Sequence, residues 1–132
     1  GRDEESDDFS GDSVTLLTMH GAKGLEYPHV YLTGLEEGLL PHRRSEFEVG
    51  GLEEERRLAY VGMTRARRSL TITYAAARTK YARQEKASPS RFLEELPEGG
   101  VRREDRRNPR EDHNDADGHM TPQDFFSRIK RL

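Results

Sequence analysis

The sequence predicts a small α/β protein whose strands lie parallel and are connected by a helix. Two stretches, Val14–Met19 and His29–Thr33, have the β-branched and apolar composition of buried strands, and Ser69–Tyr74 alternates as a third strand. Between the last two lies the best helical pattern, Glu53–Ala66, whose apolar residues recur at spacings of three and four. The order strand, strand, helix, strand is typical of a parallel α/β layer.

The segments between these elements predict loops and short helices. Residues 34–52 contain several glycines and a proline, which indicates a loop with at most one short helical turn. Residues 75–87 have no decisive pattern. Ser90–Leu96 resembles a short helix, which Pro97 ends. We therefore expect one ordered body over residues 13–97.

Both flanks of this body differ from it in composition. Residues 1–12 carry one arginine against six acidic side chains, which predicts a disordered acidic leader. Residues 98–120 are highly charged and nearly free of apolar side chains, which predicts a disordered linker within a charged C-terminal tail.

The last twelve residues, 121–132, predict a short amphipathic helix. Thr121 and Pro122 form a helix-capping signature, and three apolar residues share one face: Phe125, Ile129 and Leu132. A helix of this length is marginal alone, so it needs either the apolar surface of the body or a separate protein partner. A disordered tail with an accidental pattern is the alternative.

The composition of the 132 residues excludes several classes of protein. Without cysteine the chain has neither disulfides nor thiolate metal ligands, which fits a cytoplasmic protein, and it lacks an apolar run long enough for a membrane span. With 32% hydrophobic and 36% charged residues the core must be small. The net charge of −3 hides a basic block at residues 55–91, with ten basic and two acidic side chains, where an anionic partner is expected.

A first candidate site is the glycine-rich stretch Thr18–Glu26, with the sequence TMHGAKGLE. Its two glycines flank Lys23, so a tight turn there can direct backbone N–H groups and an ammonium at a phosphate. The Glu26 carboxylate can accept hydrogen bonds from a ribose hydroxyl. By spacing alone, an ordinary turn with an exposed lysine is the favoured interpretation.

A second candidate site lies at the end of the predicted helix. An arginine in this position, Arg65, can reach across a cleft and stabilise the charge of a transferred γ-phosphate. The alternative is that Arg65, Arg67 and Arg68 only compensate the helix dipole, which from the residues alone is favoured for the last two.

Together these two blocks resemble motifs V and VI of the UvrD/Rep/PcrA superfamily 1 DNA helicases. The stretch Thr18–Pro41, with its HGAKGLE core, is similar to motif V, and Glu53–Ala66, EEERRLAYVGMTRA, is similar to motif VI. The segment SPSRFL at 88–93 also matches, so the resemblance covers about residues 13–97. The family more often has Ser and Phe where this chain has Gly21 and Tyr27, which should loosen the turn slightly.

The resemblance implies a partial RecA-like domain of the P-loop NTPase-like class, and it implies roles for six residues. Arg65 is the implied catalytic residue, an arginine finger on the γ-phosphate. The implied nucleotide-binding residues are Gly24, Glu26 and Arg65. The implied contacts to single-stranded DNA are Thr18, His20 and Lys23.

Other parts of such a motor have no counterpart in the sequence. It contains neither a GxxxxGK[ST] phosphate loop (Walker A) nor an apolar strand ending in paired acids for magnesium (Walker B). We therefore interpret the chain as a C-terminal fragment of an ATP-dependent 3′-to-5′ DNA helicase. Its partners would be single-stranded DNA and the remainder of the motor, and we expect no association with a membrane. ATP and Mg²⁺ would act in the intact helicase, and the fragment alone would bind neither and be inactive. The alternative is a stand-alone, non-catalytic module that binds nucleic acid or protein.

Overall fold

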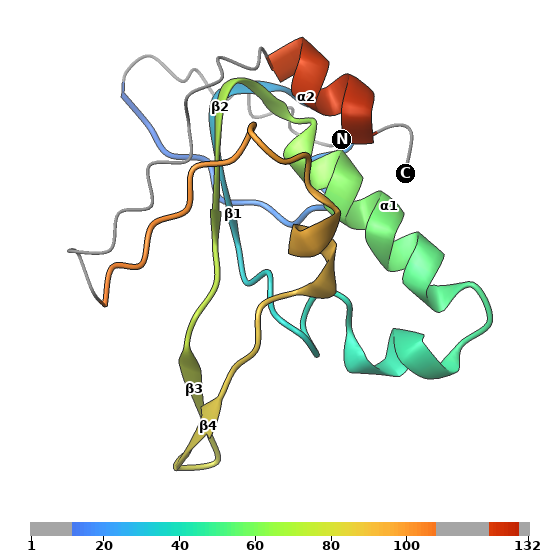
Figure 1. Cartoon of the computed structure of the whole chain (residues 1–132), viewed down its shortest axis with the longest axis vertical. Helices are drawn as coiled ribbons and strands as arrows, with labels where there is room; N and C mark the ends of the chain where they lie inside the picture. The colour runs from blue at the N-terminus through green and yellow to red at the C-terminus, as the bar shows by residue number, and fades with distance from the viewer. Residues whose placement is uncertain (1–11, 108–121, 130–132) are drawn as a thin grey trace, which may run out of the picture.

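A β-α-β unit forms the centre of the molecule (Figure 1). The computed structural model describes residues 12–107 and 122–129. The unit has three elements: β1 (Tyr27–Thr33), α1 (Gly51–Met63) and β2 (Ala66–Thr73). The two strands pair in parallel, with Val30 opposite Leu70 and Leu32 opposite Ile72. This confirms the predicted parallel α/β layer, with the helix as the connection between the strands.

The predicted strand at Val14–Met19 is wrong. This stretch has no regular secondary structure up to Thr18, and Val14 and Leu16 are 89% and 91% exposed. An apolar stretch is buried as a strand only where a neighbouring strand accepts its backbone hydrogen bonds. Within the described residues, β1 pairs with β2 and no strand lies beside residues 14–18. The composition was that of a strand, but the partner was missing.

The helix α1 lies two to three residues before its predicted bounds. It begins at Gly51 and ends at Met63, so the predicted end at Ala66 is wrong. Ala66 is instead the first residue of β2, opposite Tyr27. The turn at residues 64–65 is needed to redirect the chain into the strand.

Five smaller elements complete the described fold. They are the 3₁₀ helices η1 (Arg43–Phe47) and η2 (Arg91–Glu95), the strands β3 (Ala77–Lys80) and β4 (Arg83–Lys86), and the helix α2 (Pro122–Ile129). The two strands form an antiparallel hairpin that projects from the body (Figure 1). η1 is the single short helical turn that the predicted loop over 34–52 allowed, and η2 confirms the short helix predicted before Pro97.

The core lies between α1, the parallel strands and η2. Its buried apolar side chains are Leu32, Leu35, Leu40, Ala59, Met63 and Phe92. The two parallel strands contribute Leu32 of β1 and the partly buried Leu70 and Ile72, which alternate along β2, to this core. The core is small, as the composition predicts.

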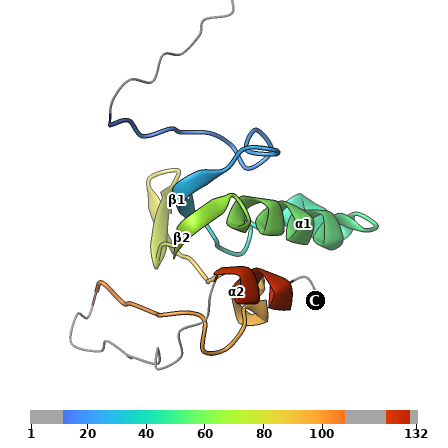
Figure 2. The ribbon, with the colours of Figure 1, turned by 90° about the horizontal axis from the view of Figure 1, so that it is seen from above.

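The C-terminal helix α2 packs against the body beside β2, as both views show (Figures 1 and 2). Among the described side chains of α2, Phe126 contacts the core cluster, and the Phe125 ring meets it edge to face with centroids 5.6 Å apart. A helix is thus present over Pro122–Ile129, and Phe126, which is outside the predicted stripe, packs on the core. Leu132 and the expectations for residues 1–11 and 108–121 lie outside the described residues.

Gly51 at the start of α1 is required by a close backbone contact. A β-carbon there would lie 2.1 Å from the carbonyl oxygen of Ser45, which is itself held in η1. We expect Gly51→Ala to lower the free energy of unfolding by about 1–3 kcal/mol, although alanine favours helices, because the backbone must shift. Gly62→Ala, whose β-carbon would meet only side-chain atoms at 3.2–3.3 Å, should cost clearly less. Urea unfolding of both variants measures the difference, and equal losses would contradict this account.

Candidate nucleotide and nucleic-acid site

The stretch resembling motif V forms a closed turn directly before β1. The Gly21 N–H donates to Thr18 Oγ1 at 3.0 Å, and the Ala22 N–H donates to the Thr18 carbonyl oxygen at 3.0 Å. Ala22 is buried, and Gly24 has φ +81°, a conformation that glycine adopts without strain. Thr18 therefore closes the turn, and Gly24 lets the chain leave it towards β1.

This turn presents its chemically active side chains to solvent. His20, Lys23 and Glu26 are all exposed. Within the described ranges, their side chains make no hydrogen bond or ion pair. A lysine, an imidazole and a carboxylate are thus exposed on one turn, and their roles toward a ligand stay predictions.

Arg65 lies in the turn after α1 and is held by three hydrogen bonds. Its Nε donates to the Val61 carbonyl oxygen at 2.9 Å, its Nη2 to Thr64 Oγ1 at 3.0 Å, and its Nη1 to the Leu25 carbonyl oxygen at 3.0 Å. A guanidinium has five N–H donors, and bonds to described residues use three of them. The other two are therefore available to a ligand, as far as the described residues go. The half-buried side chain is therefore fixed before any ligand arrives.

The two motif-like blocks meet at the amino ends of the parallel strands. The Tyr27 N–H donates to the Arg65 carbonyl oxygen at 2.9 Å, next to the side-chain bond to Leu25. On the other side of this junction α1 packs closely on the turn, since a β-carbon on Gly62 would lie 3.2 Å from Met19 Sδ. Arg65 thus contacts Leu25, which directly precedes Glu26 in the sequence. Arg67 and Arg68 lie exposed on β2, beyond this junction.

The β3–β4 hairpin is a basic and aromatic surface that the sequence left undecided. Tyr81 and Ala82 form its tip with φ of 47° and 60°, and Tyr81 is fully exposed. Four basic side chains belong to its strands: Arg78, Lys80, Arg83 and Lys86. A two-residue hairpin turn of this kind usually contains Asn or Gly, so its sequence signal was absent. The excess of basic residues in the block over 55–91 was the available signal.

Comparison with known proteins decides the family of the chain. The model of the UvrD-like helicase C-terminal domain matches residues 1–77, which is more than half of the sequence. The chain belongs to this family.

Several named helicases are similar to this UvrD-like domain. DNA helicase II of Haemophilus influenzae is 60% identical over 84 residues, which are 64% of this chain and 12% of the relative. DNA helicase II of Escherichia coli is 56% identical over 87 residues, 66% of the chain and 12% of the relative. ATP-dependent DNA helicase PcrA of Bacillus subtilis is 50% identical over 97 residues, which are 73% of this chain and 13% of the relative. The matched stretch therefore spans about an eighth of these relatives.

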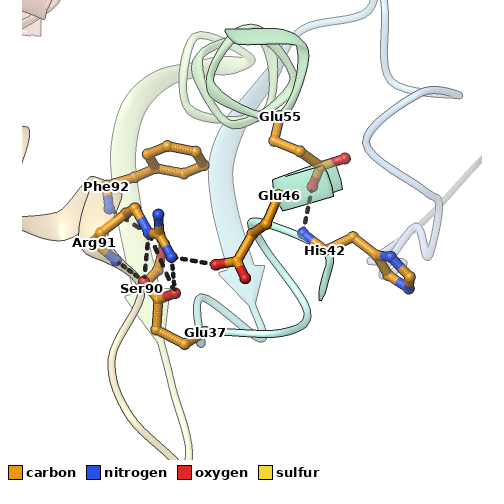
Figure 3. A network of polar contacts seen from close by, with 7 residues as sticks. All are labelled: Glu37, His42, Glu46, Glu55, Ser90, Arg91 and Phe92. Carbon is orange, nitrogen blue, oxygen red and sulfur yellow. Dashed lines mark hydrogen bonds and ion pairs between the residues drawn. The ribbon is translucent and has the colours of Figure 1, made fainter. Parts of the chain in front are cut away.

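Two ion-pair networks stabilise the loops of the UvrD-like domain, and sequence reasoning missed both. In the first, shown in Figure 3, the Arg91 guanidinium contacts Glu37, at 2.8 Å between Nη2 and Oε2, and also Glu46. Arg91 holds the pKa of Glu37 below its usual range by hydrogen bonding to the carboxylate. The backbone adds a bond from the Ser90 N–H to the Leu35 carbonyl oxygen at 2.8 Å. The segments 34–41 and 88–93, both part of the resemblance, thus bind each other.

The second network is centred on Glu36, which is buried. The Arg78 guanidinium and the Ala75 N–H both donate to its carboxylate, and the bond from Arg78 is the main reason that the pKa of Glu36 is lowered. A glutamate in a glycine-rich loop has no sequence signal for burial, because its partner lies 42 residues later in the chain.

The described part of the UvrD-like domain contains neither a cluster of metal ligands nor a membrane span. No group of three or more His, Cys, Asp or Glu side chains there could hold a metal ion. No helix there is long and apolar enough to cross a membrane.

Proposed function

We propose that this chain is the C-terminal part of the second RecA-like domain of an ATP-dependent 3′-to-5′ DNA helicase. The observation that carries the proposal is the hydrogen bond from Arg65 to the Leu25 carbonyl oxygen, because it brings the two motif-like blocks together at one edge. The names of the relatives, DNA helicase II and ATP-dependent DNA helicase PcrA, support the same activity.

In this proposal Arg65 is the arginine finger of ATP hydrolysis. Its three hydrogen bonds orient the guanidinium, so little reorganisation is needed when charge develops on the γ-phosphate. Its two remaining N–H groups donate to the phosphate oxygens in the transition state. The exposed Glu26 carboxylate accepts a hydrogen bond from the ribose, and Gly24, without a side chain, lets the nucleotide approach the backbone.

The described residues suit a phosphate but not the magnesium ion that accompanies ATP, because no group of three or more acidic or imidazole side chains among them could hold a metal ion. The phosphate loop and the metal ligands belong to the remainder of the motor in this proposal.

Single-stranded DNA binds to two surfaces in this proposal. Thr18, His20 and Lys23 of the turn contact the strand close to the nucleotide. The hairpin adds the fully exposed ring of Tyr81, on which a base can stack, and basic side chains for the phosphates. Exposed aromatic and basic residues on one hairpin are the combination that binds single strands without sequence preference.

The isolated chain is expected to show no DNA-stimulated ATP hydrolysis above buffer background, because half of the nucleotide site is missing. Phosphate release is measured with and without single-stranded DNA, and DNA helicase II of Escherichia coli serves as the positive control. Release at a rate comparable to that control would contradict the proposal that the chain is a fragment of the motor.

A second candidate function is a stand-alone module that binds nucleic acid or protein without catalysis. The basic hairpin favours it, since its contact to DNA needs no nucleotide. A chimera separates the two functions. In it, residues 13–97 of this chain replace the matching part of Escherichia coli DNA helicase II. The first predicts an active chimera, and the second predicts an inactive one that still binds DNA. A protein partner for the helix at 121–132 also remains a proposal.

A further inference from the structure

The base of the β3–β4 hairpin is held to the body by a buried carboxylate, Glu36, and by backbone hydrogen bonds on either side of it. The Leu35 N–H donates to the Thr73 carbonyl oxygen at 3.2 Å, and the Glu37 N–H donates to the Ser88 carbonyl oxygen at 3.0 Å. Glu36 is only 1% exposed, and its Oε1 accepts from the Ala75 N–H and from Arg78 Nη2, both at 2.8 Å. Its Oε2 accepts from Arg78 Nε. Ala75 lies two residues before β3 and Arg78 is in β3, so both bonds fix the point where the hairpin leaves the body.

Glu36 itself is fixed in the core. Its neighbour Leu35 is fully buried and accepts a hydrogen bond from the Ser90 N–H, and Glu36 forms a β-bridge with Pro89. Glu36 therefore connects the chain before β3 to the chain after β4. A buried carboxylate is stable only when it is paired and hydrogen-bonded, so the arrangement tolerates little movement.

Beyond these contacts at its base, the hairpin is paired with no further strand among the described residues, since β3 and β4 pair with each other there and every residue of β4 is exposed. A two-stranded hairpin alone is marginally stable in water. The direction in which Tyr81 points is thus determined at the base.

We propose that Glu36 is a positioning residue, which holds the hairpin at the angle at which Tyr81 and the basic side chains meet single-stranded DNA. This inference rests on the DNA contact of the hairpin proposed above. Arg78 serves the attachment, whereas Lys80, Arg83 and Lys86 form no ion pair with the residues described.

Simple electrostatics and positioning predict opposite results for Glu36→Gln. Removal of a negative charge beside a basic surface should strengthen the binding of a polyanion. Loss of the ion pair with Arg78 should weaken it, because the hairpin is no longer held. The matched control is Glu85→Gln, which removes an exposed carboxylate from β4, opposite Arg78 in the hairpin, and should leave binding unchanged or strengthen it.

The experiment measures the affinity of the full 132-residue chain for a fluorescein-labelled oligothymidylate by anisotropy. We expect Tyr81→Ala to weaken binding by about 5- to 150-fold, the ratio for one lost base stack. We expect Glu36→Gln to weaken binding by at least about threefold. Tyr81→Ala should reduce the affinity less in the Glu36→Gln variant than in the wild-type chain, because a misdirected ring contributes little to binding.

Two further measurements separate positioning from unfolding. Amide NMR shifts of Leu32 and Ala59 should be unchanged in Glu36→Gln, while those of Tyr81 and Ala82 move. Arg78→Lys keeps the charge but loses the two-pronged contact to Glu36, and it should also weaken binding.

Three outcomes overturn the inference. If Glu36→Gln or Arg78→Lys binds as tightly as the wild-type chain while Tyr81→Ala does not, the DNA contact stands and positioning by Glu36 is wrong. If the losses from Glu36→Gln and Tyr81→Ala simply add, Glu36 does not act through the hairpin tip. If Tyr81→Ala binds normally, the hairpin contact itself is wrong, and the inference fails with it.

Discussion

Replacement of Arg65 by alanine in an assembled motor is expected to reduce ATP turnover by about 10³–10⁵, the usual loss for an arginine finger. The assembled motor is the chimera in which residues 13–97 replace the matching segment of Escherichia coli DNA helicase II. Nucleotide binding should survive, because Arg65 is proposed to act on charge that develops only in the transition state. Steady-state phosphate release and the affinity for a fluorescent ATP analogue measure the two quantities.

Arg67→Ala and Arg68→Ala are the matched controls. Both side chains are exposed on β2, and only Arg65 is fixed against the turn by its hydrogen bond to Leu25. We expect each control to lose less than about tenfold, in keeping with the small effect of surface charges. Arg65→Lys should lose nearly as much as Arg65→Ala, because the ammonium lacks the fixed fork. Equal losses at all three positions would mean that the arginines form one DNA-binding surface.

Replacement of Phe92 by alanine is expected to lower the free energy of unfolding by about 3–5 kcal/mol. The Phe92 ring is 3% exposed in the core, and the Arg56 guanidinium lies over it, 5.6 Å from the ring centroid. Arg56 is in turn held by Glu95, at 2.9 Å between Nε and Oε2. Because small domains have only about 5–15 kcal/mol of stability in total, a large share of the molecules should unfold.

The chain offers a matched control in Phe47. This ring belongs to η1 and is 85% exposed, so Phe47→Ala should change the stability by less than about 0.5 kcal/mol. Urea unfolding followed by circular dichroism measures both variants. A loss at Phe92 no larger than that at Phe47 would contradict the core described here.

The sequence predicted those elements whose burial pattern is complete within a short stretch. β2 alternates and α1 repeats at helical spacing, so each reveals its buried face without knowledge of its neighbours. Val14–Met19 was wrong because composition alone does not say whether a strand partner is present. The hairpin was undecided because Tyr81 and Ala82 occupy a turn that normally selects other residues.

The sequence indicates the residues of the candidate site, whose roles stay predictions, but it does not indicate their contacts. A glycine-rich turn and an arginine after a helix are short patterns, and their likeness to two helicase motifs assigned roles to both. The bond from Arg65 to Leu25 joins residues 40 positions apart, and the pair of Glu36 and Arg78 joins residues 42 apart. Such contacts are determined by the fold, so no local pattern predicts them.

The hydrogen bond between Arg65 and the Leu25 carbonyl oxygen also has a thermodynamic consequence. Leu25 belongs to the same turn as His20 and Lys23, so a ligand that displaces this turn moves an acceptor of the arginine. In the proposed function DNA and nucleotide are the two ligands, and by linkage the factor by which DNA changes the affinity for nucleotide then equals the factor by which nucleotide changes the affinity for DNA. This proposal makes a single backbone carbonyl a direct route for reciprocal coupling between the two ligands.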